Sequence, residues 1–419
     1  MSSIVCEHLA APRRSLRIST VTETWPPEVN GVAKSAARFV EGLRSLGHDI
    51  QLVRLRQTEA ERANGEEILM RGMSIPRYPE LRMGLPAKRT LLRLWTLRRP
   101  DVVHIVTEGP LGWSALQAAR KLRLPAVSDF RTNFHTYSTH YGVGWLKRPI
   151  FAYLRKFHNR TLATLVPTEA MRAELAGLGF ERLRVIGRGV DTALFDPRRR
   201  DARLRASWGA RPDDPVVLYV GRLAPEKNLP TLAAAAEAAL AANARARLVF
   251  VGDGPSRHDL ATRFPQAVFA GARRGADLAA HYASGDVFLF PSLTETYGNV
   301  TLEAMASGLA VVAYDYAAAA ALIRHGTSGV LVPSADEGAF VSHAAALAAE
   351  LPRARRLGEG ARREALQRSW GRVSGELEAV LTGAARLGEA QASANEAEAM
   401  AAPSTAPAKI AAPLCGRDS

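Results

Sequence analysis

Cysteine is scarce in this chain, with two residues among 419, Cys6 and Cys415. Both lie near a chain end, which argues against a disulfide framework or a structural zinc site and fits a reducing cytoplasm. Long apolar runs are also lacking, since no stretch of about eighteen apolar residues is free of charge, so no membrane-spanning helix is expected. The first residues, MSSIVCEHLAAPRRSLRIS, lack the charged-then-apolar order of a secretory signal.

Acidic residues are in deficit, but only in one half of the chain. Lys and Arg number 55 against 41 Asp and Glu, which gives a net charge of +14. Residues 1–190 hold 30 basic and 16 acidic residues, whereas residues 191–419 hold 25 of each, so the first half carries the whole excess. Such a field attracts nucleic acid, anionic lipid or phosphorylated substrates. The alternative is an arginine-rich surface that serves no particular partner.

The chain does contain an alternation of short apolar runs and longer helical stretches, which is typical of α/β proteins with parallel sheets. Its length of 419 residues favours two domains. Strands are expected at residues 16–21, 50–55, 102–106, 126–130, 164–166 and 184–186, and then at 216–220, 247–251, 267–270, 287–290, 310–313 and 329–332. Helices are expected at residues 32–46, 112–122, 229–242 and 302–305.

The two series of strands predict two doubly wound domains that face each other. A segment rich in Gly, Pro and charge at residues 187–214 marks the break between them. The expected divisions are a tail at 1–14, a first domain at 15–190, a second at 191–387 whose last helix near 370–385 crosses back to the first, and a disordered Ala-, Ser-, Pro- and Glu-rich tail at 388–419.

The most informative stretch, FPSLTETYGNVTLEAMASGLAVVA, begins at the end of the strand expected at residues 287–290. Glu295 lies in the loop, and Glu303 lies eight positions later in a helix that begins near Asn299. The first N–H groups of a helix have no partner within it and lie at the positive end of its dipole, so they favour phosphate. Carboxylates beside them can accept hydrogen bonds from sugar hydroxyls. The simpler interpretation is a charged loop followed by a solvated helix face.

Two other loops follow predicted strands. In VLYVGRLAPEKNLPTLAAA, Gly221 permits a sharp turn before Arg222 and Lys227, two cations able to neutralise a departing diphosphate. Near the start of the chain, Asn30 and Gly31 precede an amphipathic helix, and Gly31 would let the backbone approach a ligand closely. Taken singly, each is equally compatible with an ordinary surface loop or βα turn.

Together these motifs resemble the retaining glycosyltransferases of family four, which have the GT-B fold of two Rossmann-like domains with parallel sheets facing across a cleft. The pair Glu295 and Glu303 looks like the E-x7-E signature of that family, and Arg222 with Lys227 looks like its G-R-x-x-x-x-K motif. The resemblance spans residues 17–372 and is nearest to bacterial lipid glycosyltransferases that use GDP-mannose or a UDP-sugar.

The resemblance implies a role for each matching residue. Glu295 would contact the transferred sugar, Glu303 would bind the ribose hydroxyls, and Arg222 with Lys227 would bind the pyrophosphate. The remaining donor-binding positions implied are Asn30, Gly31, Gly221, Thr296, Tyr297, Gly298, Asn299 and Val300.

The acceptor-side stretch DFRTNFHTYSTHYG departs from the family pattern. Members commonly carry a histidine shortly after this strand, whereas this chain has Arg131, with His135 four positions on. Either Arg131 replaces the family histidine or His135 supplies the imidazole from the next turn. Arg131 could contact a sugar or an anionic acceptor.

The reaction expected from the resemblance is transfer of a mannose- or glucose-type hexose to an acceptor hydroxyl, with the leaving diphosphate accepting the acceptor's proton. No cofactor is required, and no acidic pair predicts a metal site. The stretch VFVGDGPSRHDL lacks the third glycine of a dinucleotide fingerprint, which argues against a hydride-transfer cofactor. A GT-B phosphorylase, a sugar-nucleotide epimerase and a nucleic-acid-binding protein are the alternatives, although no nucleic-acid motif supports the last.

The acceptor is expected to be a lipid or a lipid-linked glycan, with the protein at the inner face of the cytoplasmic membrane. Segment 82–99, RMGLPAKRTLLRLWTLRR, mixes leucines and Trp95 with Lys88, Arg89 and Arg93. If it is helical from Pro86 onward, its apolar residues could reach an anionic membrane beside these cations. The alternative is an ordinary amphipathic helix packed on the sheet.

Overall fold

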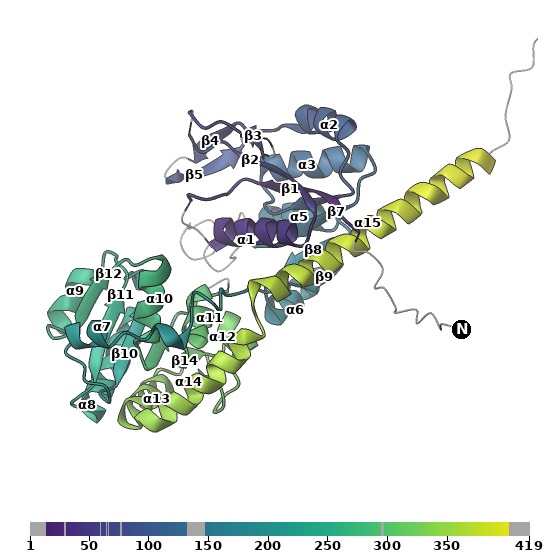
Figure 1. Ribbon diagram of the computed structural model, residues 1–419. Coiled ribbons are helices and arrows are strands. Elements are labelled where there is room, and N and C mark those ends of the chain that lie inside the picture. Colours follow the sequence, from purple (N-terminus) through teal and green to yellow (C-terminus); the bar gives the residue numbers. More distant parts are fainter. Residues whose placement is uncertain are drawn as a thin grey trace, which may run out of the picture.

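The computed structural model describes residues 14–28, 31–58, 60–63, 65, 67–75, 78–131, 147–294 and 297–401. Its strands form two parallel sheets, one from each half of the chain, which Figure 1 shows as an upper and a lower body. A small antiparallel hairpin of β4 (Gly72–Ile75) and β5 (Tyr78–Gly84) extends the first half.

The first sheet has seven strands in the order β3-β2-β1-β6-β7-β8-β9, all parallel. The strands are β1 (Arg17–Thr22), β2 (Asp49–Leu55), β3 (Glu67–Met70), β6 (Val102–Ile105), β7 (Ala126–Asp129), β8 (Ala163–Val166) and β9 (Leu183–Val185). Its helices are α1 (Gly31–Ser45), α2 (Lys88–Leu97), α3 (Pro110–Lys121), α5 (Lys147–His158) and α6 (Glu169–Gly177).

The second sheet has six parallel strands in the order β12-β11-β10-β13-β14-β15. They are β10 (Val216–Val220), β11 (Arg247–Val251), β12 (Val268–Gly271), β13 (Val287–Phe290), β14 (Ala310–Tyr314) and β15 (Val330–Val332). The helices are η2 (Pro197–Arg199), α7 (Ala202–Ser207), η3 (Pro225–Lys227), α8 (Leu229–Ala242), α9 (Arg257–Arg263), α10 (Gly275–Ala283), α11 (Asn299–Ala306), α12 (Ala317–Leu322), α13 (Glu337–Ala349) and α14 (Leu351–Leu366).

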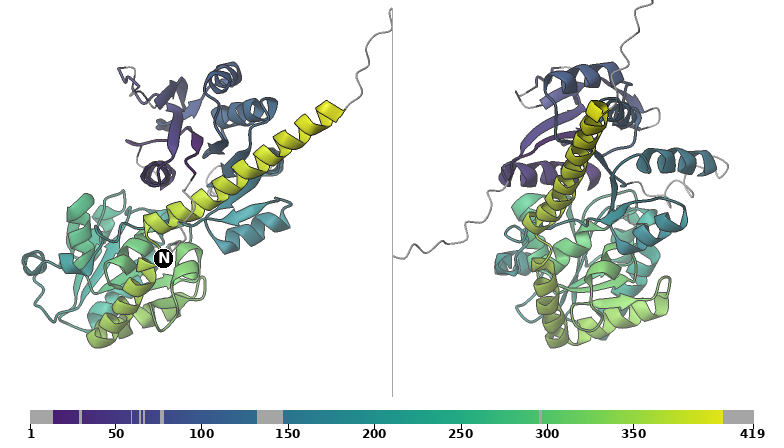
Figure 2. Two further views of the ribbon diagram at one scale, coloured as in Figure 1. Left: turned by 45° about the vertical axis from the view of Figure 1, so that its right-hand side comes forward. Right: turned by 90° about the vertical axis from the view of Figure 1, so that its right-hand side faces the viewer.

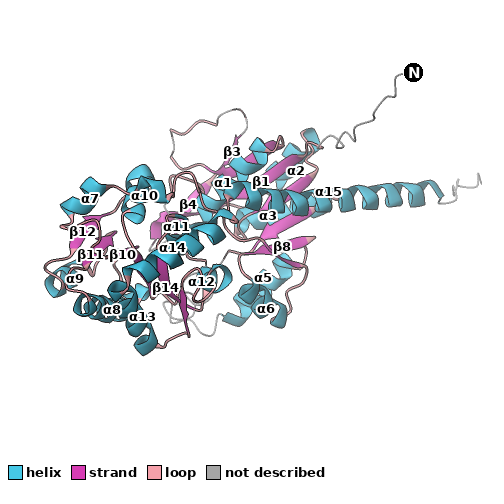
Figure 3. Cartoon of the chain, turned by 60° about the horizontal axis from the view of Figure 1, so that its bottom comes forward, coloured by secondary structure: helices cyan, strands magenta, loops and turns pink. Residues whose placement is uncertain are grey.

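In both sheets the strand order reverses beside the first strand of the half, between β1 and β6 and between β10 and β13. Ligands of open α/β sheets bind at such switch points, outside the carboxyl ends of the strands. The loops after these four strands are therefore where the fold places a binding site. Helices flank both sheets, as Figure 3 shows.

The two faces of the first sheet have separate apolar cores. Because successive side chains of a strand point to opposite faces, Ile18 of β1 packs against α1, whereas Val21 packs against α2 and α3. The last helix, α15 (Trp370–Ala401), begins beside the second body and lies against the first, as Figure 2 shows from two sides. Its Leu377 and Leu381 belong to the same core as α1. The chain thus crosses back to the first body through α15.

Three features differ from the sequence expectations. Strands β3, β4 and β5 were not anticipated, because β3 and β4 have only four residues each and β5, YPELRMG, is not an apolar run. Helix α15 continues through residues 388–401, where composition predicted disorder. The Ala- and Glu-rich sequence there has high helix propensity and extends a helix that is already nucleated.

The structure also contradicts the expectation that Trp95 and the central leucines of segment 82–99 could reach a membrane. Leu91 and Trp95 of α2 are fully buried, and the indole Nε1–H of Trp95 donates to Ser19 Oγ and Gln51 Oε1, both at 3.0 Å. The apolar face of α2 therefore packs on the sheet, and its exposed residues are the cations, two threonines and Leu97.

Candidate active site

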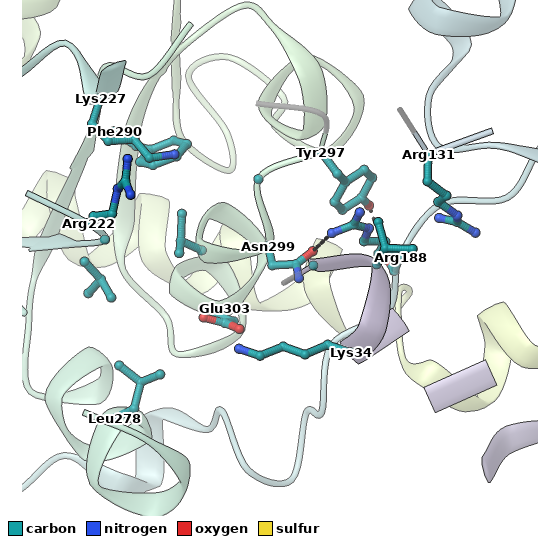
Figure 4. A pocket seen from close by; sticks show the side chains of 16 residues that line it. Lys34, Arg131, Arg188, Arg222, Lys227, Leu278, Phe290, Tyr297, Asn299 and Glu303 are labelled. Atoms are coloured by element: carbon teal, nitrogen blue, oxygen red, sulfur yellow. Dashed lines mark hydrogen bonds between the residues drawn. The ribbon is translucent and has the colours of Figure 1, made fainter. Parts of the chain in front are cut away.

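A cavity of about 450 Å³ lies at the switch points, between the two sheets. Figure 4 shows its side chains, which come from both halves of the chain. The lining residues are Gly31, Val32, Lys34, Arg131, Arg188, Val220, Gly221, Arg222, Lys227, Leu278, Phe290, Tyr297, Gly298, Asn299, Val300 and Glu303. Among the candidates predicted from the sequence, Asn30, His135, Glu295 and Thr296 lie outside the described residues.

The loop after β10 is shaped by close backbone packing. Gly221 has φ +156, and a Cβ on neighbouring Gly252, itself at φ +138, would lie 1.9 Å from the Gly221 carbonyl oxygen. The Asn228 side chain donates to the Pro291 carbonyl at 3.2 Å, and Thr294 Oγ1 donates to the Glu226 carbonyl at 3.0 Å. These contacts tie the loops after β10 and β13 into one rigid wall.

Two cations project from this wall into the cavity. Arg222 forms an ion pair with Glu226 at 2.6 Å, and its side chain is 66% exposed. Burial raises the pKa of the Glu226 carboxyl, but its backbone hydrogen bond and the charges of Arg222 and Lys227 outweigh this and lower the pKa overall. Arg222 is therefore accessible to an incoming anion, which would compete with Glu226 for it.

Helix α11 begins at the cavity wall. Its N-cap residue is Gly298, at φ +90, a conformation that favours glycine, and among the described residues no side chain accepts a hydrogen bond from the first N–H groups of the helix. The first turn of α11, with Asn299 and Val300, lines the cavity beside Tyr297. An uncapped helix start that faces a cavity is suited to bind an anion.

Glu303 lies one turn further along α11. Its Oε2 accepts a hydrogen bond from the hydroxyl of buried Tyr282 at 3.1 Å. Burial raises the pKa of Glu303 above its ordinary value, while the Tyr282 hydrogen bond and the charge of Lys34 oppose that rise. The carboxylate is thus held in place, with one face toward the cavity (Figure 4).

Arg188 connects the two halves and was not identified from the sequence. Its Nη1 donates to Asn299 Oδ1 at 3.1 Å, and its guanidinium lies 5.6 Å from the centroid of the Tyr297 ring. A Cβ on Gly31 would lie 2.8 Å from the same Nη1, so Gly31 makes room for this arginine. The sequence analysis placed Arg188 only in the segment that separates the two domains.

On the side of the first half, Arg131 is 5% exposed and its Nε donates to Asp129 Oδ2 at 3.1 Å. The other carboxylate oxygen of Asp129 lies 2.9 Å from His104 Nε2. Burial would raise the pKa of Asp129, but Arg131 and His104 lower it overall. Arg131 Nη2 also lies 3.1 Å from Asp129 Oδ2, and within the described residues neither Nη1 nor Nη2 has a hydrogen-bond partner, although the residue lines the cavity.

No cluster of three or more His, Cys, Asp or Glu side chains that could hold a metal ion occurs among the described residues. None of the described helices is both long and apolar enough to cross a membrane.

Comparison with known proteins matches both halves of the chain. Residues 29–194 match the model for Glycosyltransferase Family 4, and residues 214–350 match the model for Glycosyl transferases group 1. A GDP-mannose-dependent alpha-mannosyltransferase of Mycolicibacterium smegmatis is 38% identical over 86% of this chain and 96% of its own length. The sulfoquinovosyl transferase SQD2 of Arabidopsis thaliana is 34% identical over 73% of this chain and 60% of its own length.

Solved structures agree on the fold. Anabaena HepE in complex with UDP has a TM-score of 0.70 at 18% identity, over 88% of this chain and all of that one. Sucrose-phosphate synthase from Thermosynechococcus elongatus has a TM-score of 0.68 at 20% identity, with the same coverage. The chain therefore belongs to glycosyltransferase family 4 and is a nucleotide-sugar-dependent hexosyltransferase with the GT-B fold.

Proposed function

We propose that the protein is a retaining α-mannosyltransferase that moves mannose from GDP-mannose to a hydroxyl of a lipid or lipid-linked glycan. The observation that carries this is the 38% identity to a GDP-mannose-dependent alpha-mannosyltransferase across 96% of that protein's length. The uncapped start of α11, facing Arg222 and Lys227 across one cavity, supports a diphosphate-bearing donor.

In this proposal the donor diphosphate binds between the first turn of α11 and the two cations. Glu303 accepts hydrogen bonds from the ribose hydroxyls, and Leu278 lies where a nucleobase could pack. Gly221, Tyr297, Gly298, Asn299 and Val300 shape the wall around the diphosphate. Asn30, Gly31, Glu295 and Thr296 retain the donor-side roles that family resemblance implies.

The chemistry requires charge stabilisation more than a protein nucleophile. The bond between the anomeric carbon and the phosphate oxygen breaks as the acceptor oxygen attacks the same face of the sugar, and the acceptor proton passes to the leaving phosphate. Arg222, Lys227 and the α11 N–H groups stabilise the negative charge that develops there. Arg131 or His135 would orient the acceptor or the transferred sugar.

A UDP-hexose donor is the second candidate. An alpha-monoglucosyldiacylglycerol synthase of Streptococcus pneumoniae is 27% identical over 71% of this chain and 71% of its own length. Thermal-shift measurements with GDP, UDP and ADP would separate the candidates, because a ligand at 100 times its Kd stabilises the fold by about 2.7 kcal/mol. Stabilisation by UDP alone would contradict GDP-mannose as the donor.

The product decides the reaction class. Incubation with GDP-mannose and a lipid acceptor should give an α-linked mannosyl lipid, identified by mass and by its anomeric NMR signal. Release of sugar phosphate with inorganic phosphate as the acceptor would indicate a phosphorylase instead.

Within this scheme, Glu303→Ala should weaken GDP binding, whereas Glu295→Ala should mainly slow transfer. Equal losses of GDP affinity would contradict the division of roles.

For access to a lipid acceptor we propose that α5, rather than α2, contacts an anionic membrane. On α5, Ile150 is 37% and Tyr153 39% exposed, and Arg148, Arg155 and Lys156 are exposed on the same helix. The Tyr153 hydroxyl donates to the Glu108 carbonyl at 2.6 Å, which holds α5 beside the carboxyl edge of the first sheet. Basic residues at such a surface contribute about 1 kcal/mol each.

Co-sedimentation with vesicles tests this contact. Binding should require anionic lipid and should fall more in the Ile150→Asp, Lys156→Glu double variant than in the Lys88→Glu, Arg89→Glu double variant of α2. Binding that ignores lipid charge and both pairs of substitutions would contradict the membrane proposal.

A further inference from the structure

Lys34 is a cation of the cavity that the sequence motifs did not identify. It lies in the first turn of α1, in the first half of the chain, and its ammonium extends across the cleft toward the Glu303 carboxylate of α11 (Figure 4). It also lines a second cavity, of about 390 Å³, with which the first shares Lys34, Asn299 and Glu303. Lys34 and Glu303 therefore face each other where the two cavities meet.

Among the described residues, no carboxylate forms a close ion pair with the Lys34 ammonium, which acts on Glu303 only from across the cleft. Arg38, one turn along α1, pairs with Glu41 at 3.2 Å and with Asp191 at 3.4 Å. Lys34, by contrast, forms no ion pair within 4.0 Å of any carboxylate in the described parts of the chain, and its side chain is exposed. Glu303, which it faces, accepts its hydrogen bond from Tyr282. A donor from one domain and an acceptor from the other thus lie on opposite sides of an open space.

A nucleotide offers matching groups for this space. A ribose hydroxyl can donate to a carboxylate and accept from an ammonium, and the neighbouring phosphate oxygens accept from an ammonium. Arg222 and Lys227 already supply the cations of the second half. The first half has one lysine at this cavity, and it lies on the side of Glu303.

We infer that Lys34 is a nucleotide-binding residue of the first domain, which donates to the ribose and adjacent phosphate oxygens beside Glu303. This inference rests on the proposed donor site. Because Glu303 and Lys34 belong to different domains, a nucleotide bound by both favours the arrangement in which the domains are closest. Lys34 thereby couples donor binding to closure of the cleft.

The test compares Lys34→Met, which removes the charge and keeps the length, with Lys34→Arg, which keeps the charge. Lys121→Met is the matched control, because Lys121 is an exposed lysine on α3 of the same domain. Isothermal titration with GDP and UDP should give a Kd raised about tenfold or more in Lys34→Met, as expected for a lost charge-assisted hydrogen bond. Lys34→Arg should remain within about threefold of the parent, and Lys121→Met should match it.

Small-angle scattering gives a second readout. The parent should become more compact on addition of the nucleotide that it binds, and Lys34→Met should contract less at saturating nucleotide. An unchanged Kd in Lys34→Met, or an equal loss in Lys34→Arg, would overturn the role of Lys34 while leaving the donor site intact. Absence of GDP and UDP binding by the parent would instead overturn the proposed donor site, and this inference with it.

Discussion

The two halves of the protein use equivalent helix starts in opposite ways. In the first half, α3 follows β6 at the switch point, and the buried Glu23 carboxylate accepts hydrogen bonds from the N–H groups of Leu111 and Gly112, at 2.7 and 3.3 Å. In the second half, α11 follows β13 and its start lines the cavity, where no side chain of the described residues caps it. The first half fills its anion position with its own carboxylate, and the second leaves that position open.

The cores of the two halves also differ in how many polar side chains they contain. The described apolar core of the second half is one continuous cluster, and β10, β13 and β14 are buried at every position. The first half divides its core among three clusters, and its sheet buries polar side chains that bond one another, such as Ser128 with His158. The strands of the first sheet therefore bury many polar side chains, whereas the described strands of the second sheet bury apolar side chains.

The largest effect expected from this comparison concerns the open anion position. Arg222→Ala and Lys227→Ala should each lower turnover on the order of 100-fold, because each removes a charge that stabilises the leaving diphosphate. Their melting temperatures should stay near that of the parent. Steady-state kinetics with Arg203→Ala, an exposed cation of α7, as the control would check this. Turnover within about threefold of the parent in both variants would mean that the diphosphate binds elsewhere.

Removal of the Glu23 carboxylate should leave the N–H groups at the start of α3 open to an external anion, as at the start of α11. Glu23→Ala should lower the free energy of unfolding by about 2 kcal/mol, because buried N–H groups of α3 lose their acceptor. Added sulfate or phosphate should then raise the melting temperature of the variant more than that of the parent or of Glu41→Ala. If sulfate stabilises all three proteins equally, the vacated position does not bind anions.

The polar core should make the first half the more acid-sensitive. Burial lowers the pKa of His158 from 6.5 to about 3. Below pH 6.5 the unfolded chain therefore takes up a proton that the folded chain excludes, so stability falls by up to about 1.4 kcal/mol per pH unit between pH 6.5 and 3.

Hydrogen exchange measured by mass spectrometry at pH 7 and 5 would locate this loss. Protection should decrease more around β7, β8 and α5 than around β10 and β13, and His158→Gln should reduce the difference. Equal losses of protection in the two halves would contradict the assignment to His158.

The smallest expected effect concerns the hydrogen bond from the Tyr282 hydroxyl to the Glu303 carboxylate. Nucleotide binding needs the ionised carboxylate, so affinity should fall as the pH drops through its raised pKa. The Tyr282 hydroxyl opposes that rise, so Tyr282→Phe should move the acid limb of GDP binding upward by about one pH unit. Titration calorimetry over a pH series measures this shift. If the acid limb of GDP binding does not move in Tyr282→Phe, Tyr282 does not influence the pKa of Glu303.

Most of the sheet framework and the loops of the donor side could be predicted from the amino-acid sequence. Strands of parallel sheets are buried on both faces, so β10, β11 and β13 appear as apolar runs whose bounds the sequence predicted. Gly221, Arg222, Lys227 and Gly298 lie in the segments that follow such runs, so their place at the cavity could be predicted from local sequence.

The residues that meet across the cleft, and the surfaces that cover each helix, became visible only in the folded structure. Arg188 bonds Asn299 from 111 positions away, and Lys34 faces Glu303 from the other half of the chain, so no local pattern identifies either residue. The periodicity of α2 revealed an apolar face but not that the sheet covers it. Periodicity and propensity are properties of neighbouring residues, whereas these contacts depend on where the folded backbone brings distant segments together.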